Sequence, residues 1–281
     1  MNYLHQIICV KHEFAYFCLS KRNQEMKIIS YNVNGIRAAI KKDLVAFIQS
    51  ENPDIICFQE IKANQEDIDE EIFQNLGYQC YWASAAKKGY SGVGILTKKT
   101  PNAIEIGMKD AFFDNEGRTI MAHFDQFSVI NTYFPSGTSG DIRQDLKYEF
   151  LDTYFKFITE LKQKHPNLVV LGDYNIAHTD IDIHSPKTNQ KTSGFLPEER
   201  AWMTKWFESG MVDSYRYLHP DQTGAYTWWT MRFPSVRLEN KGWRIDYISI
   251  SESLKENLAS ANIYPDAKQS DHCPLSIELK F

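Results

Sequence analysis

Residues of catalytic type follow an apolar run in the segment LVVLGDYNIAH, residues 168–178. Four apolar residues lead into Gly172, Asp173, Asn175 and His178. Such a run is typical of a buried strand, and side chains two positions apart on an extended chain point to the same side. The segment therefore ends either in a polar turn or in one wall of an active site.

Other apolar runs end in the same way, which favours the active site. Turns commonly use Asn, Asp, Gly and Ser, but they do not favour Glu or Tyr and seldom contain a lone His. The residues at or beside the end of such a run are Asn32, Asn34, Glu60, Tyr133, Asp246, Asp271 and His272. Together with Asp173 and Asn175, we interpret them as one site.

These side chains are suited to metal-assisted hydrolysis of a phosphodiester. Carboxylate and amide oxygens are hard ligands that favour Mg²⁺ over zinc, and Mn²⁺ is expected to substitute for Mg²⁺. The candidate metal ligands are Asn32, Asn34, Glu60, Asp173, Asn175, Asp271 and His272. The candidate catalytic residues are Tyr133, Asp173, Asn175, Asp246 and His272.

Each candidate catalytic residue has an expected task. Asp246 can fix the tautomer of His272, and Asn175 and Tyr133 can donate hydrogen bonds to the charge that develops on the phosphate. Asp173 can take a proton from water or give one to a leaving oxygen, provided that neighbouring carboxylates raise its pKa. No Ser or Cys lies in an elbow such as GxSxG, so a nucleophilic Ser or Cys is not expected.

Short strands and a few helices must position these residues, which predicts an α/β fold. β-Branched and aromatic residues predict strands over 27–32, 54–60, 92–98, 118–124, 127–134, 167–173, 244–251 and 273–280. Apolar residues at helical spacing predict helices over 41–52, 65–77, 145–164 and 197–210. We expect one compact domain with two sheets packed face to face and helices outside.

The composition indicates a globular protein that does not hold nucleic acid by its overall charge. The net charge is −5, and a cluster of acids that awaits a cation would contribute to it. No apolar stretch approaches the roughly 18 residues that span a bilayer. Five cysteines without CxxC spacing favour reduced thiols. We expect a cytoplasmic protein with no membrane contact, associated with the nucleoid in a bacterium.

The first 25 residues differ from the rest of the chain. Charges interrupt their apolar runs too early for a signal peptide, and Met26 directly precedes the first clean strand pattern. We expect residues 1–25 to be a flexible or mis-annotated extension and residues 26–281 to form a single catalytic domain.

Seven segments, in order from about Met26 to Phe281, resemble the exonuclease III class of apurinic/apyrimidinic (AP) endonucleases. They are YNVNGIR (31–37), DIICFQEIK (54–62), GYSGVGIL (89–96), EGR (116–118), GDYNIAH (172–178), GWRIDY (242–247) and SDHCP (270–274). The resemblance implies a four-layer α/β sandwich like that of DNase I, in which two mainly antiparallel sheets are flanked by helices.

The resemblance also implies a Mg²⁺-dependent DNA repair nuclease. Such an enzyme cleaves double-stranded DNA 5′ of an abasic site and leaves a 3′-hydroxyl; removal of 3′ blocking groups and 3′→5′ exonuclease activity stay open. Glu60 is implied as the main metal ligand, with Asp271 and an asparagine of the NVN segment. Asn34 stands where some relatives have Asp, which removes one anionic ligand and leaves open whether one or two ions act. A monomer is the default expectation.

Further positions resemble the DNA contacts of that class. Backbone contacts are implied for Arg37, Lys62, Tyr90, Arg118, Arg143 and Lys147, and a contact near the lesion for Asn189. The second asparagine of that loop is replaced by Thr192. Trp228, Trp243 and Ile245 resemble the walls of a pocket that accepts a flipped-out abasic sugar and excludes a normal nucleotide by size.

Two alternatives stay open at this point. A phosphodiesterase or phosphatase of the same superfamily would act on RNA, inositol phosphates or sphingomyelin, although GWRIDY and the aromatic pocket favour DNA repair. A catalytically inactive relative would bind nucleic acid as a regulator, although such a protein is expected to lose part of the acid cluster. Nuclease activity that disappears with EDTA separates an active enzyme from an inactive binder.

Overall fold

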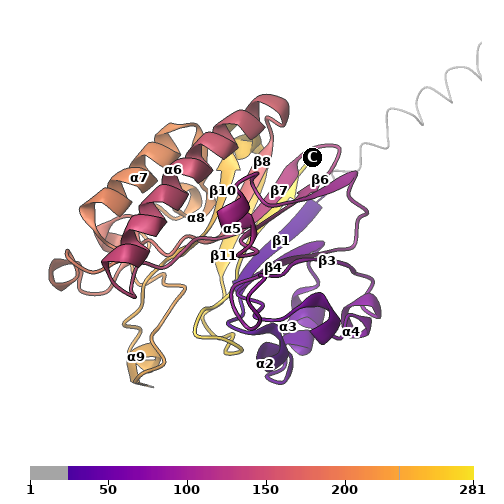
Figure 1. Ribbon diagram of the computed structural model, residues 1–281, viewed down its shortest axis with the longest axis horizontal. Coiled ribbons are helices and arrows are strands. Elements are labelled where there is room, and N and C mark those ends of the chain that lie inside the picture. Colours follow the sequence, from indigo (N-terminus) through magenta and orange to yellow (C-terminus); the bar gives the residue numbers. More distant parts are fainter. Residues whose placement is uncertain (1–24, 234) are drawn as a thin grey trace, which may run out of the picture.

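Two six-stranded β-sheets pack face to face, and helices cover their outer surfaces (Figure 1). The structure, a computed structural model, describes residues 25–233 and 235–281. The first sheet contains, in spatial order, β11 (Leu258–Ile263), β12 (Leu275–Lys280), β1 (Glu25–Asn32), β2 (Ile55–Gln59), β4 (Val93–Thr97) and β3 (Gln79–Ala83). The second contains β5 (Ala103–Ile106), β6 (Thr119–His123), β7 (Ser128–Tyr133), β8 (Leu168–Asp173), β10 (Asp246–Ser251) and β9 (Met211–Asp213).

Each sheet contains one parallel pair, β1–β2 in the first and β7–β8 in the second. The other neighbouring strands are antiparallel. The inner faces of both sheets bury side chains such as Ile28, Ile55, Val129 and Ile248, as expected from the two-residue period of a strand. The expected four-layer α/β sandwich of two mainly antiparallel sheets is confirmed.

Helices cover the two outer sheet faces. Those on the first sheet are α2 (Ile36–Ile40), α3 (Leu44–Glu51) and α4 (Glu71–Gln74), and their side chains share one apolar cluster with β1 and β2. Those on the second sheet are α6 (Asp141–Lys164) and α7 (Pro197–Glu208), which bury aromatic residues against the strands. Shorter helices are α5 (Ala111–Asp114), α8 (Ser214–Leu218) and α9 (Ser235–Leu238).

All eight predicted strands form, and each is an interior strand of its sheet. Within the described residues, the strands that the sequence pattern does not predict are β3, β5, β9 and β11, and all of them lie at sheet edges.

Two helix predictions are corrected. Residues 65–77 do not form one helix, because Ile68 is extended and buries its side chain in the cluster outside the first sheet. A 3₁₀ turn, Gln65–Asp67, therefore precedes the separate helix α4. The helix predicted over 41–52 begins only at Leu44, because Asp43 has a left-handed φ of 64°.

The beginning of β1 bears on the predicted extension. Glu25 already belongs to this strand and pairs with Lys280 of β12. The rest of residues 1–25 lies outside the described part of the chain, so the extension and the single domain over 26–281 stay predictions. No helix in the described part has the length and hydropathy of a membrane span.

Candidate active site

Strand directions gather the polar ends of the second sheet at one place. β7 and β8 are parallel, and Tyr133 is the register partner of Asp173. β10 runs antiparallel to β8, so its first residue, Asp246, also pairs with Asp173. Gly172 allows this close pairing, because its φ is 139° and a Cβ there would lie 1.9 Å from the carbonyl oxygen of Thr132.

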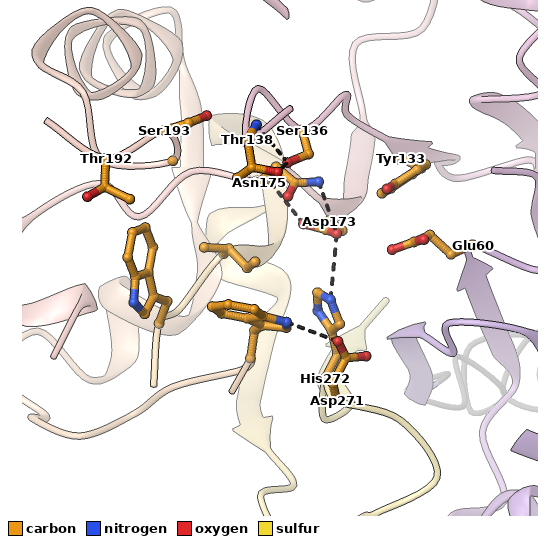
Figure 2. Close-up of a pocket in the computed structure, with 14 residues that line it drawn as sticks. Glu60, Tyr133, Ser136, Thr138, Asp173, Asn175, Thr192, Ser193, Asp271 and His272 are labelled. Carbon is orange, nitrogen blue, oxygen red and sulfur yellow. Dashed lines mark hydrogen bonds and ion pairs between the residues drawn. The ribbon is translucent and has the colours of Figure 1, made fainter. Parts of the chain in front are cut away.

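The first sheet brings its polar ends to the same place (Figure 2). Since β1 and β2 are parallel, Asn32 and Glu60 end neighbouring strands on one side. β12 runs antiparallel to β1, so Asp271 and His272, which precede β12, return to that side. The site therefore lies where the two sheets meet, and each sheet supplies part of it.

Asn32 joins the two sheets at the centre of the site. Its buried side-chain amide donates hydrogen bonds of 2.9 Å to Glu60 Oε1 and of 2.9 Å to Asp173 Oδ2. Its oxygen accepts a hydrogen bond from the backbone N–H of Asn34. The structure thus places Asn32 where it orients two carboxylates, with its own oxygen already engaged.

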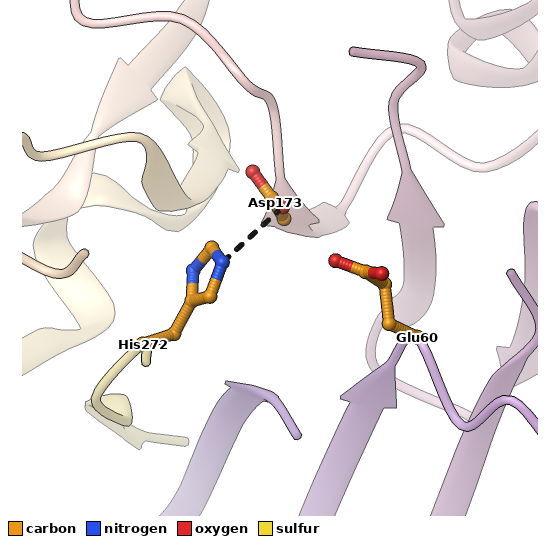
Figure 3. Close-up of side chains that lie close together, drawn as sticks. All are labelled: Glu60, Asp173 and His272. Carbon is orange, nitrogen blue, oxygen red and sulfur yellow. Dashed lines mark ion pairs between the residues drawn. The ribbon is translucent and has the colours of Figure 1, made fainter. Parts of the chain in front are cut away.

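Glu60, Asp173 and His272 converge on one point (Figure 3). One potential ligand atom from each of the three lies within 4.8 Å of the other two. Carboxylate oxygens are the ligands that Mg²⁺ and Mn²⁺ prefer, so the residues present fit a hard divalent cation.

Asp246 and Asp173 hold the imidazole of His272 between them. Nδ1 lies 2.9 Å from Asp246 Oδ2, and Nε2 lies 3.9 Å from Asp173 Oδ2. Burial alone would lower the pKa of His272, but the charges of Asp246 and Asp173 raise it to about 10. The ring therefore carries two protons at neutral pH and is a hydrogen-bond donor, so the two carboxylates are the better cation ligands.

The pKa of the Asp173 carboxyl is raised toward neutral pH. Burial is the main cause that raises its pKa, the charge of Asp246 adds to this, and the value reaches about 8. Such a pKa lies near the working pH, where an acid or base is most effective. This is the condition that the sequence-based role of Asp173 requires.

Asp271 lies beside the three converging residues and is held by other donors. Oδ1 accepts from the amide of Asn34 at 2.9 Å, and Oδ2 accepts from the indole N–H of Trp228 at 3.1 Å. The ammonium of Lys62 pairs with Glu60 Oε2 at 2.8 Å and also contacts the amide oxygen of Asn34. Both predicted ligands, Asn34 and Asp271, are thus near the cluster but bonded to protein groups.

Several residues of the site have left-handed backbone conformations. Asn34, Glu60 and Asn175 have φ values of 44°, 49° and 54°. Asn175 is held there by hydrogen bonds of its backbone N–H to Asp173 Oδ1, at 2.8 Å, and of its side-chain amide to the carbonyl of Phe134, at 3.0 Å. Non-glycine residues in this region are strained, and such residues concentrate at functional sites.

A pocket opens directly beside the carboxylates (Figure 2). Its cavity of about 270 Å³ is lined by the polar site and by three apolar side chains, Trp228, Trp243 and Ile245. The two indole rings meet edge to face, with centroids 6.2 Å apart. The structure therefore brings the three predicted pocket residues together next to Asp173.

A buried ion network supports that pocket. Arg244 stands between Trp243 and Ile245, and its guanidinium donates to Asp182 Oδ1 at 2.7 Å and to Asp213 Oδ2 at 2.8 Å. Burial alone would raise the pKa of Asp182, but Arg244, and then Arg216, lower it well below its usual range. The network fixes the segment just before β10 that carries the pocket residues Trp243 and Ile245.

Two predicted DNA contacts have buried side chains, the first of which is Arg118. Its side chain is only 2% exposed, and its guanidinium donates to Glu116, to the hydroxyl of Tyr90 and to the carbonyl of Tyr133. These donors are engaged inside the protein and hold Tyr90 and Tyr133, and the contact of Arg118 with DNA stays a prediction. Arg143, half-buried, also donates to the Tyr90 hydroxyl.

Lys147 is the second buried position. Its ammonium is completely buried, where it pairs with Glu199 and donates to the backbone carbonyl of Asn175 at 2.8 Å. A buried ammonium in these bonds is not available to a DNA phosphate. The resemblance to known DNA contacts implied this residue, whereas its burial depends on the facing helix.

The remaining predicted DNA contacts lie around the rim. Arg37 is exposed on α2, and Lys62 and Asn189 are half-buried. Asn189 accepts a hydrogen bond of 3.3 Å from the hydroxyl of Thr192, the residue that replaces a second asparagine. Their contacts with DNA stay predictions.

Sequence analysis missed other residues that line the pocket. They are Ser136, Thr138, Ser193 and Gly194. Small polar residues and glycine are common in every surface loop, so their types carry no signal; only the folding of two distant loops over Asp173 brings them to the site.

The comparison with known families agrees with this geometry. The model of the endonuclease/exonuclease/phosphatase family matches residues 29–272. The chain belongs to this family. This match and the relatives described next confirm the expectation of a nuclease hydrolase of the AP endonuclease and exodeoxyribonuclease type.

Relatives of this family member match about nine tenths of the chain. An exodeoxyribonuclease from Bacillus subtilis is 41% identical over 253 residues, which cover 90% of this chain and 98% of the relative. A DNA-(apurinic or apyrimidinic site) endonuclease from Dictyostelium discoideum is 40% identical over 255 residues, 90% of this chain and 70% of that protein. A solved 3′ phosphatase from Neisseria, bound to a product DNA hairpin, superposes with a TM-score of 0.84 at 28% identity, covering 91% and 100% of the two chains.

Proposed function

We propose that this family member is a Mg²⁺-dependent DNA repair nuclease that hydrolyses the phosphodiester 5′ of an abasic site and leaves a 3′-hydroxyl. Removal of 3′ blocking groups and 3′→5′ exonuclease digestion belong to the same proposal, because both use the same bond chemistry at a strand end. Double-stranded DNA is the proposed partner, bound by a monomer.

One observation carries this proposal. A pocket with two indole rings and an isoleucine, Trp228, Trp243 and Ile245, shares its wall with the carboxylates of Glu60 and Asp173. A cavity of about 270 Å³ with this apolar wall can receive a sugar that has lost its base. It excludes a full nucleotide by size, so selection for an abasic site needs no contact to a base edge.

Glu60 and Asp173 would hold the metal ion. When bound, Mg²⁺ neutralises charge on the scissile phosphate and on the leaving oxygen. The nearby imidazolium of His272, kept in place by Asp246, adds a positive donor for a phosphate oxygen. This division of tasks supports hydrolysis without a covalent intermediate on the protein.

Tyr133 and Asn175 would complete the contacts to the phosphate. Burial and the charge of Glu60 raise the pKa of Tyr133 well above its usual value, so its hydroxyl keeps the proton that a donor needs. Two roles fit Asp173: its carboxylate can take a proton from the attacking water, and its carboxylic acid can give one to the leaving oxygen.

The test uses two labelled duplexes, one with a central tetrahydrofuran in place of a nucleotide and one intact with a recessed 3′ end. Each is incubated with Mg²⁺, with EDTA, and with the Asp173→Asn variant in Mg²⁺. We expect incision immediately 5′ of the tetrahydrofuran that depends on Mg²⁺ and is lost in the variant. Digestion of the recessed end alone would change the assignment to an exonuclease.

The same experiment tests the two alternatives. If neither duplex is cleaved in Mg²⁺ or Mn²⁺ but bis-p-nitrophenyl phosphate is hydrolysed, the substrate is another phosphodiester. Binding of the duplex without any turnover would indicate an inactive regulator. The intact set of Glu60, Asp173, Asn175, Asp246 and His272 argues against the inactive form.

A further inference from the structure

Lys147 and Glu199 form a completely buried ion pair that the proposed mechanism does not use. Lys147 lies on α6, Glu199 lies on α7, and neither side chain has any exposed surface. Taking two charges out of water is costly, and apolar residues of similar volume often replace such a pair without loss of stability. Folding alone therefore does not explain why both charges stand here.

The carboxylate of Glu199 fixes one wall of the pocket. Its Oε2 accepts hydrogen bonds from the backbone N–H groups of Gly194, at 2.6 Å, and Leu196, at 3.0 Å. Its Oε1 accepts from Gln144 at 3.1 Å, and Gln144 in turn accepts from the hydroxyl of Ser193 at 2.7 Å. We call residues 192–196 the pocket wall; Thr192, Ser193 and Gly194 line the cavity.

The ammonium of Lys147 fixes the segment that carries the catalytic carboxyl. It donates to the carbonyl oxygen of Asn175 at 2.8 Å, in the residue whose backbone is left-handed. We call residues 173–178 the catalytic turn. The turn and the wall also touch directly, since Ala177 N–H donates to the Gly194 carbonyl at 2.8 Å and a Cβ on Gly194 would lie 3.1 Å from the Asn175 oxygen.

We propose that Lys147 and Glu199 are positioning residues whose ion pair fixes the catalytic turn against the pocket wall. Since α6 and α7 are packed helices, the pair gives both loops a rigid support at a set separation. A substrate seated against the wall is then held in register with Asp173. The role in turnover rests on the proposed function, whereas the coupling of the two loops does not.

The double variant Lys147→Met/Glu199→Gln tests this proposal. It removes both charges together, so no unpaired charge stays buried, and the neutral amide oxygen of a glutamine accepts the two N–H bonds of the wall more weakly than a carboxylate does. Lys162→Met is the matched control, because Lys162 lies on the same helix and its ammonium also donates to backbone carbonyls, those of Ser209 and Gly210, away from the site. Lys147→Arg is the conservative variant and the substitute if the double variant does not fold.

Two measurements are made on each protein. Hydrogen exchange by mass spectrometry follows 173–178 and 192–196 in the absence of substrate. Incision of the tetrahydrofuran duplex in Mg²⁺ gives kcat and KM. We expect faster exchange in both segments of the double variant and a fall in kcat of about tenfold to a hundredfold with KM changed less than about threefold, because a misplacement of about 1 Å costs this much rate. Lys147→Arg should recover part of kcat, and Lys162→Met should match the parent.

The proposal is overturned if exchange rises only in 192–196, because the pair would then not couple the wall to the turn. It is also overturned if the double variant incises as fast as the parent, or if Lys162→Met loses the same activity. If the parent itself does not incise the duplex, the proposed function fails, and coupled exchange in the two segments still decides the coupling proposal.

Discussion

Asp173 and Asp246 face each other as register partners of β8 and β10, and the ring of His272 contacts both carboxylates. Two acids thus share one imidazolium at the edge of a sheet. The strand register sets their separation, so the raised pKa values of Asp173 and His272 depend on backbone pairing.

Replacement of Asp246 by Asn should lower the pKa of His272. Asp246 is the strongest favourable partner of the imidazolium, so its loss should lower that pKa by about 1–2 units. NMR titration of the metal-free protein, with His272→Gln to assign the signal, measures the shift. We also expect incision to slow roughly a hundredfold. Asp266→Asn, on the surface, is the control; an unchanged His272 titration in Asp246→Asn would contradict the role given to this pair.

Replacement of Glu60 by Gln should weaken Mg²⁺ binding. Loss of groups that merely orient a ligand costs about 10–100-fold in metal affinity, so loss of a ligand charge should cost at least about tenfold. Calorimetric titration of Mg²⁺ measures this without substrate. Glu252→Gln changes an exposed carboxylate and should leave the affinity unchanged. Equal Mg²⁺ affinity in parent and Glu60→Gln would remove Glu60 from the metal site.

Replacement of Trp228 by Phe should raise KM for the tetrahydrofuran duplex several-fold. The change widens the pocket and removes the hydrogen bond from the indole N–H to Asp271 Oδ2. The loss of such a hydrogen bond costs about 1 kcal/mol. Steady-state incision kinetics measure it. Trp229→Phe is the matched control, because its indole N–H donates to Asn240 instead; that variant should keep the parent KM.

Replacement of Asp182 by Asn should destabilise the protein by about 3 kcal/mol at pH 7, because Arg244 loses a buried partner. Since the pKa of Asp182 is lower in the folded state, its contribution is fully present above the unfolded-state pKa of about 3.9 and is lost as pH falls below it. Urea unfolding at several pH values should show the gap between parent and variant narrowing in acid.

The control for this prediction lies two residues earlier in the chain. Asp180 makes an exposed ion pair with Arg200, and exposed pairs contribute about 1 kcal/mol or less. Asp180→Asn should therefore leave the free energy of unfolding almost unchanged. If the two variants were equally stable, the buried network would not support the pocket segment.

The interior strands of both sheets were predictable because they are largely buried and rich in β-branched and aromatic residues. The edge strands were not: β5 buries little of its side-chain surface and β11 buries only Leu258 and Ala261, without the alternation of a strand. Edge strands are commonly short and polar, which limits pairing with other chains. An edge strand forms by pairing with the neighbouring strand, and the local sequence pattern does not indicate this pairing.

The site was predictable where residue type and strand position coincide, as for Glu60, Asp173 and His272, although their roles stay proposals. The site was not predictable where burial determines whether a charged side chain is accessible to a ligand. Arg118 and Lys147 have the charge of DNA contacts, yet each is enclosed by carboxylates and carbonyls from other elements. Glu199 gave no signal, because a glutamate in the first turn of a helix is ordinary.

Asn32 spans the junction between the two sheets, with Glu60 on one side and Asp173 on the other. Any ligand that bonds to both carboxylates therefore also links the two sheets, which are otherwise joined by apolar contacts and by the hydrogen bonds between Asn131 and residues of β2 and β4. The binding free energy of such a ligand adds to the stability of the folded state in which the two sheets are packed together. The enzyme should therefore be most resistant to unfolding while substrate is bound. A mutation that weakens the packing between the two sheets should reduce catalytic activity before it causes unfolding.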